Sequence, residues 1–153
     1  MFIVFDLDDT LSRPQHRLHH ILECDEQGVP IHGATRKDAD WDTFYASRVD
    51  DTPIGEAIAM FHTLARHHHV EVWTASGESH REVTQDWLWH NAGIPRHLLT
   101  NMRPAGDHRP AVVLKEGWIL ARKPDLAFDD HRSVVAMMRR HGVFACAVGD
   151  NEY

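Results

Sequence analysis

The sequence FIVFDLDDTL, residues 2–11, runs from four apolar residues directly into three aspartates. A short, uninterrupted apolar run is typical of a central strand in a parallel sheet, because both faces of such a strand are covered. Carboxylates crowded at its end repel one another, and this costs free energy unless a cation or a proton intervenes. The stretch therefore predicts a buried strand over 2–5, followed by a site that needs positive charge.

The composition indicates one globular domain over residues 1–153. Of the 153 residues, 42% are hydrophobic and 25% are charged, and the net charge is −7, values that suit a single core. The acidity disfavours an extended electrostatic grip on nucleic acid, although a chain end can still bind in a pocket. With no membrane-length apolar run, no secretion signal and two cysteines, we expect a cytoplasmic protein that does not contact a membrane.

Strand-like runs alternate with helical patterns, which predicts an α/β fold, a doubly wound, Rossmann-like parallel sheet of five strands. The strands are expected at 2–5, 70–73, 98–100, 126–128 and 143–148, and the helices at 54–67, 78–92, 111–121 and 132–141. Residues 12–52 are polar, rich in histidine and irregular, and we interpret them as a flap or small cap inserted after the first strand. Asp150, near the chain end, is expected to be solvated.

Ligands of doubly wound sheets bind at the carboxyl ends of the strands. Asp6 and Asp8 follow the first predicted strand, and Asp129 and Asp130 follow the fourth. Because these strands are natural neighbours across the switch point, the four carboxylates should converge. Mg²⁺ resolves their repulsion most simply, since it prefers oxygen ligands. The alternative is that the aspartates only cap helices.

Two further residues fit a phosphate site at the same edge. Thr74 follows the second strand, where its hydroxyl and the next backbone N–H, that of Ala75, can hold a phosphate oxygen. Lys115 lies early in the helix after the third strand and can reach the carboxyl edge, whereas Lys123 precedes the fourth strand and lies at the opposite edge. The alternative for Lys115 is a solvated charge paired with a nearby glutamate.

These motifs resemble a known family. FDLDDTL, VEVWTAS, Lys115 and LAFDD are similar to the four motifs of the haloacid dehalogenase (HAD) superfamily of phosphatases. A closer resemblance, to the 3′-phosphatase domain of bacteriophage-type polynucleotide kinase–phosphatases, spans nearly the whole chain and is carried by VDDTPI, MRPAGDHRP, VVLKE, FDDHRSVVAMMRRHGV and AVGDNEY. The GxxxxGK[ST] loop of the kinase half is absent from this sequence, so no kinase activity is implied.

The resemblance implies a role for each matching residue. Asp6 is expected to be the nucleophile that forms an aspartyl-phosphate, and Asp8 the general acid and then the base. Thr10 is expected to shape the loop between them. Thr74 and Lys115 are expected to bind the phosphoryl oxygens.

The implied Mg²⁺ site combines Asp6, the backbone carbonyl of Asp8, Asp129 and Asp130. One departure concerns the second motif, where the family often has Gly-Arg after the hydroxyl and this chain has Ala75-Ser76. Arg81, one helical turn further on, is a candidate replacement.

Other flap and loop residues are candidates for substrate contacts. Arg17 and Arg109, then Arg13 and Arg103, are expected to approach the carboxyl edge, where arginine suits phosphate; the alternative is pairing with surface carboxylates. The flap also contains three aromatic residues, Trp41, Phe44 and Tyr45. They are expected either to stack on a base or to form a small core for the flap.

The reading that follows is a Mg²⁺-dependent phosphohydrolase acting on a 3′-phosphate of a polynucleotide end or a nucleotide. A phosphatase of free nucleotides, similar to a 5′-nucleotidase, or of another small phosphoester is the first alternative. A non-catalytic HAD-like binding module is the second. The sequence leaves open the choice between DNA and RNA and the oligomeric state.

Overall fold

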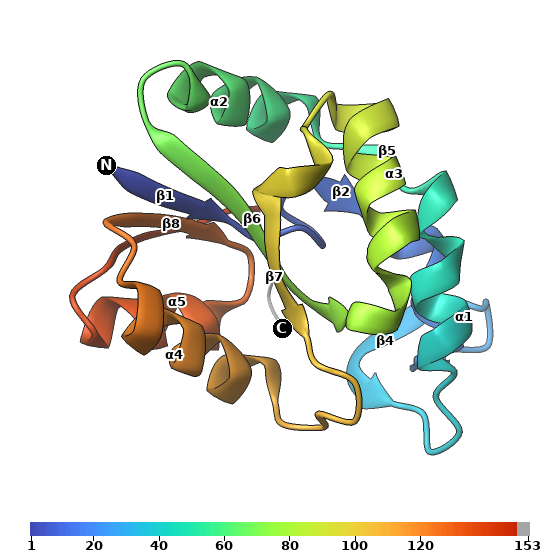
Figure 1. The fold of residues 1–153 in the computed structure, drawn as a ribbon. Coiled ribbons are helices and arrows are strands. Elements are labelled where there is room, and N and C mark those ends of the chain that lie inside the picture. Colours follow the sequence, from blue (N-terminus) through green and yellow to red (C-terminus); the bar gives the residue numbers. More distant parts are fainter. Residues whose placement is uncertain (150–153) are drawn as a thin grey trace.

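The computed structural model, described here for residues 1–149, is built on a five-stranded parallel sheet (Figure 1). Its strand order is β7-β6-β1-β8-β9, and each neighbouring pair runs parallel. The strands are β1 (Phe2–Phe5), β6 (His69–Gly77), β7 (Leu99–Arg103), β8 (Leu126–Asp129) and β9 (Phe144–Ala147). The predicted doubly wound α/β class is therefore confirmed. Asp150 lies outside the described residues.

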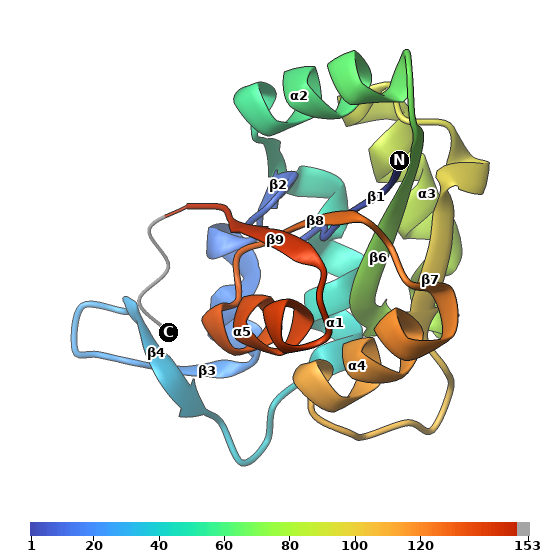
Figure 2. The same ribbon diagram turned by 90° about the vertical axis from the view of Figure 1, so that its left-hand side faces the viewer.

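Helices cover both faces of the sheet (Figures 1 and 2). On one face lie α2 (Gly55–Ala65) and α3 (Arg81–Ala92), and on the other lie α4 (Ala111–Arg122) and α5 (Arg132–Arg140). Because side chains of a strand alternate, Ile3 and Phe5 pack with the first pair of helices and Val4 with the second. Double coverage is the reason that β1 is apolar throughout.

Two strands extend further than the hydrophobic pattern indicated. β6 continues past Trp73 to Gly77, so Thr74 lies inside a strand and not after it. Likewise Arg103 ends β7 and is not a loop residue. The pairing of β6 with β7 shifts register twice beyond Val72. The apolar pattern stops at Trp73 because the later residues of β6 line a cavity and do not pack in the core.

The insertion between β1 and α2 has its own small framework. Its neck is an antiparallel pair, β2 (Ser12–Arg13) with β5 (Thr52–Pro53). Between them lie a 3₁₀ helix (Gln15–His20), a hairpin of β3 (Leu22–Cys24) and β4 (Pro30–Thr35), the helix α1 (Trp41–Ala46) and a second 3₁₀ helix (Ser47–Asp50). The hairpin projects from the body of the molecule in Figure 2. This segment is the flap that the sequence predicted over residues 12–52, and in the structure it extends to Pro53 at the end of β5. From here on, the flap means residues 12–53.

None of the helices in residues 1–149 combines the length and the apolar character that a membrane span requires.

A buried carboxylate joins several elements at the amino end of the sheet. Glu71 on β6 accepts hydrogen bonds from Arg122 of α4 at 2.6 and 2.7 Å and from the Trp73 indole at 2.9 Å, and it also pairs with Thr100 and His69. Burial by itself raises the pKa of Glu71, but these partners outweigh it and lower the pKa to about 2. Glu71 is therefore charged in the folded protein.

Glu71→Gln should lower the free energy of unfolding at pH 7 by about 2 kcal/mol, because hydrogen bonds to a charged group are lost. A lowered pKa in the folded state means that the stabilisation is present above the ordinary value of 4.5 and disappears as the pH falls towards 2. Urea unfolding curves of the variant and the wild type should therefore converge over that range.

The matched control is Glu78→Gln, which removes an exposed carboxylate paired with Arg81. Because exposed ion pairs contribute little, this variant should change stability by less than about 1 kcal/mol. A gap between Glu71→Gln and the wild type that is as wide at pH 2 as at pH 7 would contradict the account.

Candidate active site

The loop after β1 turns two carboxylates towards one cavity. The Asp6 N–H continues the sheet by donating to the Phe128 carbonyl at 2.8 Å, and the N–H groups of Leu11 and Ser12 both donate to the Leu7 carbonyl, at 2.8 and 3.0 Å. Leu7 is buried, while its neighbours Asp6 and Asp8 line the cavity. The alternation of the strand thus continues into the loop.

Lys115 joins the ends of the two central strands. Its Nζ donates to Asp6 Oδ1 and to Asp129 Oδ2, each at 2.6 Å, and all three side chains are buried. Burial by itself lowers the pKa of Lys115, but Asp129 and then Asp6 outweigh it and raise the pKa. The alternative that Lys115 pairs with Glu116 or Glu78 on the surface does not match this geometry.

Negative charge still exceeds positive charge around Asp6. Burial raises the pKa of Asp6; Lys115 lowers it, Asp129 and Asp8 raise it again, and the net shift is upward. The pKa of Asp130 is also raised, by burial first and then by Asp6 and Asp129. Like charges held this close favour either a proton or a bound cation. The carboxylates that the sequence predicted to converge do lie together.

Asp8 faces two arginines from the flap. Arg48 forms an end-on bidentate pair with it, with Nη1 2.9 Å from Oδ1 and Nη2 2.9 Å from Oδ2, and Arg17 Nη2 donates to Oδ1 at 2.5 Å. Burial by itself raises the pKa of Asp8, but Arg48 and then Arg17 hold it well below its usual range. Ser76 Oγ adds a hydrogen bond to Asp8 at 3.2 Å. Arg48, Arg17 and Ser76 therefore fix the position of the Asp8 carboxylate.

The two arginines are anchored differently. Arg17 also donates to both oxygens of the buried Asp51, each at 2.7 Å, and to the Phe44 carbonyl at 3.0 Å. Arg48 donates to Ser76 Oγ at 2.7 Å, and its buried Nε has no hydrogen-bond partner in the structure. The sequence analysis assigned no role to Arg48, Asp51 or Ser76. Asp51 and Ser76 lie within the matching segments VDDTPI and VEVWTAS, whereas no periodicity or motif marks Arg48.

The second motif is organised by hydroxyl groups. Thr74 Oγ1 accepts the Ser76 N–H at 3.1 Å and donates to Ser76 Oγ at 3.1 Å, and both side chains are buried. Since Ser76 in turn contacts Asp8 and Arg48, the hydroxyls connect β6 to the flap. Arg48 thus reaches, from a distant segment, the position at which the sequence lacks the arginine of related motifs.

One cavity of about 790 Å³ collects most of these groups at the carboxyl end of the sheet. Its lining comes from the β1 loop, the end of β6, the flap, the loop after β7 and the starts of α4 and α5. The predicted residues on its wall are Asp6, Asp8, Thr74, Ala75, Arg103, Arg109, Lys115 and Asp130, with the flap aromatics Trp41, Phe44 and Tyr45.

Three arginines predicted as substrate contacts, Arg13, Arg17 and Arg81, do not line this cavity, and neither does Thr10 of the β1 loop. Arg13 lies on β2 and is exposed. Arg17 is fully buried behind Asp8, so it holds that carboxylate and does not face the cavity. Arg81 binds Glu78 and the Leu99 carbonyl. Thr10 is fully buried, and its Oγ1 lacks a hydrogen-bond partner. The arginines were misplaced because distance along the sequence does not show which way a side chain points.

The two arginines that line the cavity, Arg103 and Arg109, already form hydrogen bonds within the protein. Arg103 Nε donates to the Ala75 carbonyl at 2.9 Å, and its Nη1 donates to the carbonyls of Asp107 and Arg109. Arg109 is held by the Asp107 carboxylate, with contacts from 2.5 to 3.1 Å. Both shape the loop after β7, and Arg109 is the more exposed side chain.

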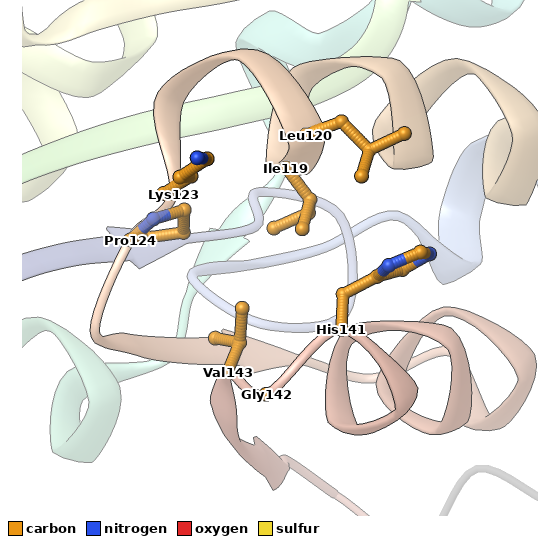
Figure 3. A pocket seen from close by; sticks show the side chains of 7 residues that line it. All are labelled: Ile119, Leu120, Lys123, Pro124, His141, Gly142 and Val143. Carbon is orange, nitrogen blue, oxygen red and sulfur yellow. The ribbon is translucent and has the colours of Figure 1, made fainter.

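A second, smaller cavity lies at the opposite end of the fold (Figure 3). It measures about 210 Å³ and is lined by Ile119, Leu120, Lys123, Pro124, His141, Gly142 and Val143. Lys123 ends α4 here, before β8, as the sequence reasoning placed it. No carboxylate lines this cavity, so the acidic chemistry belongs to the larger one.

The acidic cluster bears on whether the site can hold a metal ion. Within residues 1–149, no three or more His, Cys, Asp or Glu side chains are grouped so that they could hold an ion. Mg²⁺ is commonly bound by one or two carboxylates together with water and substrate phosphate, so the charge excess around Asp6 and Asp130 still fits it. Asp129 is shared with Lys115.

Comparison with known proteins identifies the family. The model of the HAD_PNKP family, the polynucleotide kinase PNKP phosphatase domain, matches residues 24–153. The chain belongs to this family. The match begins after the β1 loop, and the fold of this HAD phosphatase supplies Asp6 and Asp8 from outside the matched segment. The predicted membership of the HAD superfamily, close to PNKP-type domains, is confirmed.

Solved structures agree on the fold. A chain of the Pnkp1/Rnl/Hen1 complex is similar over 99% of this HAD_PNKP chain, with a TM-score of 0.71 and 18% identity. This chain spans 46% of that one. The haloacid dehalogenase-like hydrolase SP0104 from Streptococcus pneumoniae matches 97% of this chain and 84% of its own, with a TM-score of 0.63 and 15% identity.

A third similar structure is the HAD family enzyme bt-2542 from Bacteroides thetaiotaomicron, in complex with magnesium and inorganic phosphate. It covers 99% of this chain and 96% of its own, with a TM-score of 0.52 and 11% identity. No curated protein matches the sequence.

Arg48→Ala should reduce kcat for phosphate release on the order of 100-fold, because a small displacement of a reacting group has an effect of that size. Arg48→Lys should recover little, since an ammonium cannot form the bidentate pair. Steady-state kinetics with an aryl phosphate and Mg²⁺ measure both variants.

The matched control is Arg36→Ala, which removes an exposed flap arginine that pairs with Asp38. It should leave kcat unchanged. If Arg48→Ala folds, as judged by circular dichroism, and turns over at the wild-type rate, the pairing with Asp8 has no catalytic consequence.

Proposed function

We propose that this HAD phosphatase is a Mg²⁺-dependent phosphohydrolase that removes a 3′-phosphate from polynucleotide ends or nucleotides through an aspartyl-phosphate. The observation that carries the proposal is the arrangement at the end of β1. Asp6 is bound by Lys115, and Asp8 is held two residues away by Arg48 and Arg17. One carboxylate is thereby placed for attack and the other for proton transfer.

In the first step, a carboxylate oxygen of Asp6 bonds to phosphorus while the bond to the ester oxygen breaks. The leaving alkoxide takes its proton from Asp8. In the second step, water attacks the phosphorus of the aspartyl-phosphate while the bond from phosphorus to the Asp6 oxygen breaks, and Asp8 accepts a proton from that water. Inorganic phosphate leaves and the Asp6 carboxylate is restored. Lys115 and Thr74 bind the phosphoryl oxygens, whose negative charge grows during transfer.

The proton on Asp8 depends on the substrate. With both arginines on it, Asp8 is a carboxylate, which suits its role as a base towards water. A phosphate dianion that enters the cavity adds negative charge beside Asp8, and like charge raises the pKa of a carboxyl group. The arriving substrate therefore favours the protonated form that the first step requires.

Mg²⁺ would be held by Asp6, Asp129 and Asp130 together with the backbone carbonyl of Asp8. Bound there, it would neutralise phosphate charge next to the nucleophile. The raised pKa values of Asp6 and Asp130 support this proposal, because they mark a surplus of negative charge.

The choice of a 3′-phosphate is supported by the family, which is described as the phosphatase domain of polynucleotide kinase PNKP. One observation favours the second candidate, a phosphatase of free nucleotides or other small phosphoesters. Further carboxylates line the cavity around the predicted site, and they repel additional backbone phosphates: Asp9, Asp42, Glu78 and Asp107. A cytoplasmic setting stays a prediction from the sequence.

Asp6→Asn should abolish turnover, with a loss of at least about 1,000-fold, because an amide oxygen does not form the acyl phosphate. Phosphate release in the presence of Mg²⁺ measures this, and chelation by EDTA should reduce wild-type activity to a similar degree. Asp38→Asn, at an exposed flap aspartate, is the control and should be fully active. A folded Asp6→Asn variant with wild-type activity would refute the mechanism.

A matched substrate panel decides between the two candidates. It contains an oligonucleotide 3′-phosphate, its 5′-phosphate isomer, and the 3′- and 5′-mononucleotides. We expect the highest kcat/KM on the oligonucleotide 3′-phosphate. A preference for mononucleotides would move the function to small phosphoesters, and no hydrolysis of any member would contradict both.

A further inference from the structure

One aromatic side chain of the flap remains exposed at the catalytic cavity. Trp41 is the first residue of α1, and Asp40 caps that helix by accepting the Thr43 N–H at 2.9 Å. The indole is 44% exposed, although it belongs to the lining of the cavity that contains Asp6 and Asp8. A large aromatic ring at the wall of this cavity is available for contact with a ligand.

The neighbouring aromatics account for the flap core without Trp41. Phe44 is buried with Leu18 and Ile21. Tyr45 packs partly against the same cluster and approaches His80, with ring centroids 5.4 Å apart. Trp41 touches Phe44 and Tyr45 only from outside, at centroid distances of 5.8 and 5.9 Å. The sequence left open whether the flap aromatics form a small core or stack on a base. In the structure, Phe44 belongs to the core, while Trp41 lies at the cavity.

The cavity has room for more than a phosphate group. Its volume of about 790 Å³ lies within the range of sites for whole small molecules, roughly 300–1,000 Å³. Tyr45 also lies beside Gly77, at the end of β6 and directly after Ser76, and it connects Trp41 to the phosphate side of the cavity. A group joined to the phosphate can therefore extend along α1.

The carboxylates near Trp41 determine which part of a substrate can bind beside its indole. Asp42, next to Trp41 in the chain, and Glu78 both line the cavity, and Asp42 is largely exposed, 3.8 Å from His80. Carboxylates oppose a second phosphate at this place but not a neutral planar group. An exposed indole favours a flat ring, because bases stack on aromatic side chains irrespective of sequence.

We propose that Trp41 is a stacking platform for the base of the nucleoside whose phosphate is removed. The inference rests on the proposed function and narrows it, because it makes recognition of the leaving group depend on a base and not on a run of phosphates. A nucleoside phosphate, free or at a chain end, is then the substrate class.

The kinetic test compares a substrate with a base, adenosine 3′-monophosphate, with glycerol 2-phosphate, an ester of a secondary alcohol without a base. Trp41→Ala should lower the ratio of their kcat/KM values about ten-fold or more, through KM of the nucleotide, since one stacked base contributes on this scale. Trp41→Phe should recover part of the ratio. Trp89→Ala, at another exposed tryptophan, which lies on α3 outside the cavity lining, should leave it unchanged. An unaltered ratio in Trp41→Ala would overturn the inference.

A binding test does not need turnover. Adenosine 3′-monophosphate should quench the tryptophan fluorescence of Asp6→Asn in Mg²⁺ buffer. The quenching should persist when Trp89→Ala is added and disappear when Trp41→Ala is added. Quenching that survives the loss of Trp41 would overturn the inference. Quenching that needs Trp41, combined with a wild type that hydrolyses neither ester, would support the stacking site and refute the proposed hydrolysis.

Discussion

The rest of the site depends on one buried ammonium group, that of Lys115, which bridges Asp6 and Asp129 at 2.6 Å each. β1 and β8 are paired neighbours, so their carboxylates are forced together at the edge of the sheet. A buried carboxylate without a partner is strongly destabilising. The α4 helix therefore has to deliver a cation to this place. The same contact holds Asp6, the proposed nucleophile, in position, so that stability and the proposed chemistry share one interaction.

A second charge arrangement couples the flap to the sheet. Arg17 and Arg48 have no exposed surface, and Asp8 and Asp51 balance them. Two arginines and two carboxylates form a neutral unit, which lowers the cost of burying each charge. The flap consequently also orients Asp8, because its two buried arginines hold that carboxylate. Its outer aromatic, Trp41, is left for the substrate.

Prediction from sequence succeeded where the physical signal is local. A strand covered on both faces must be apolar throughout, and this located β1 and its carboxylates. The predicted helix end at residue 92 agrees with α3, which ends where Gly93 adopts a φ of 63° that is unfavourable for most other residues. Prediction was less accurate where polar residues continue a strand, as Thr74 does in β6. Hydrophobic patterning reports burial, while a strand is defined by backbone pairing.

The order of apolar and acidic residues was sufficient to establish the parallel sheet, the edge at which its ligands bind and the convergence of Asp6 with Asp129. These features follow from alternation and strand adjacency, which are properties of short segments. The partners of Asp8 were decided in three dimensions. Arg48 lies 40 residues from Asp8 in an irregular segment, and no periodicity connects the two. Their contact exists because the flap folds back over the sheet and buries its arginines against that carboxylate.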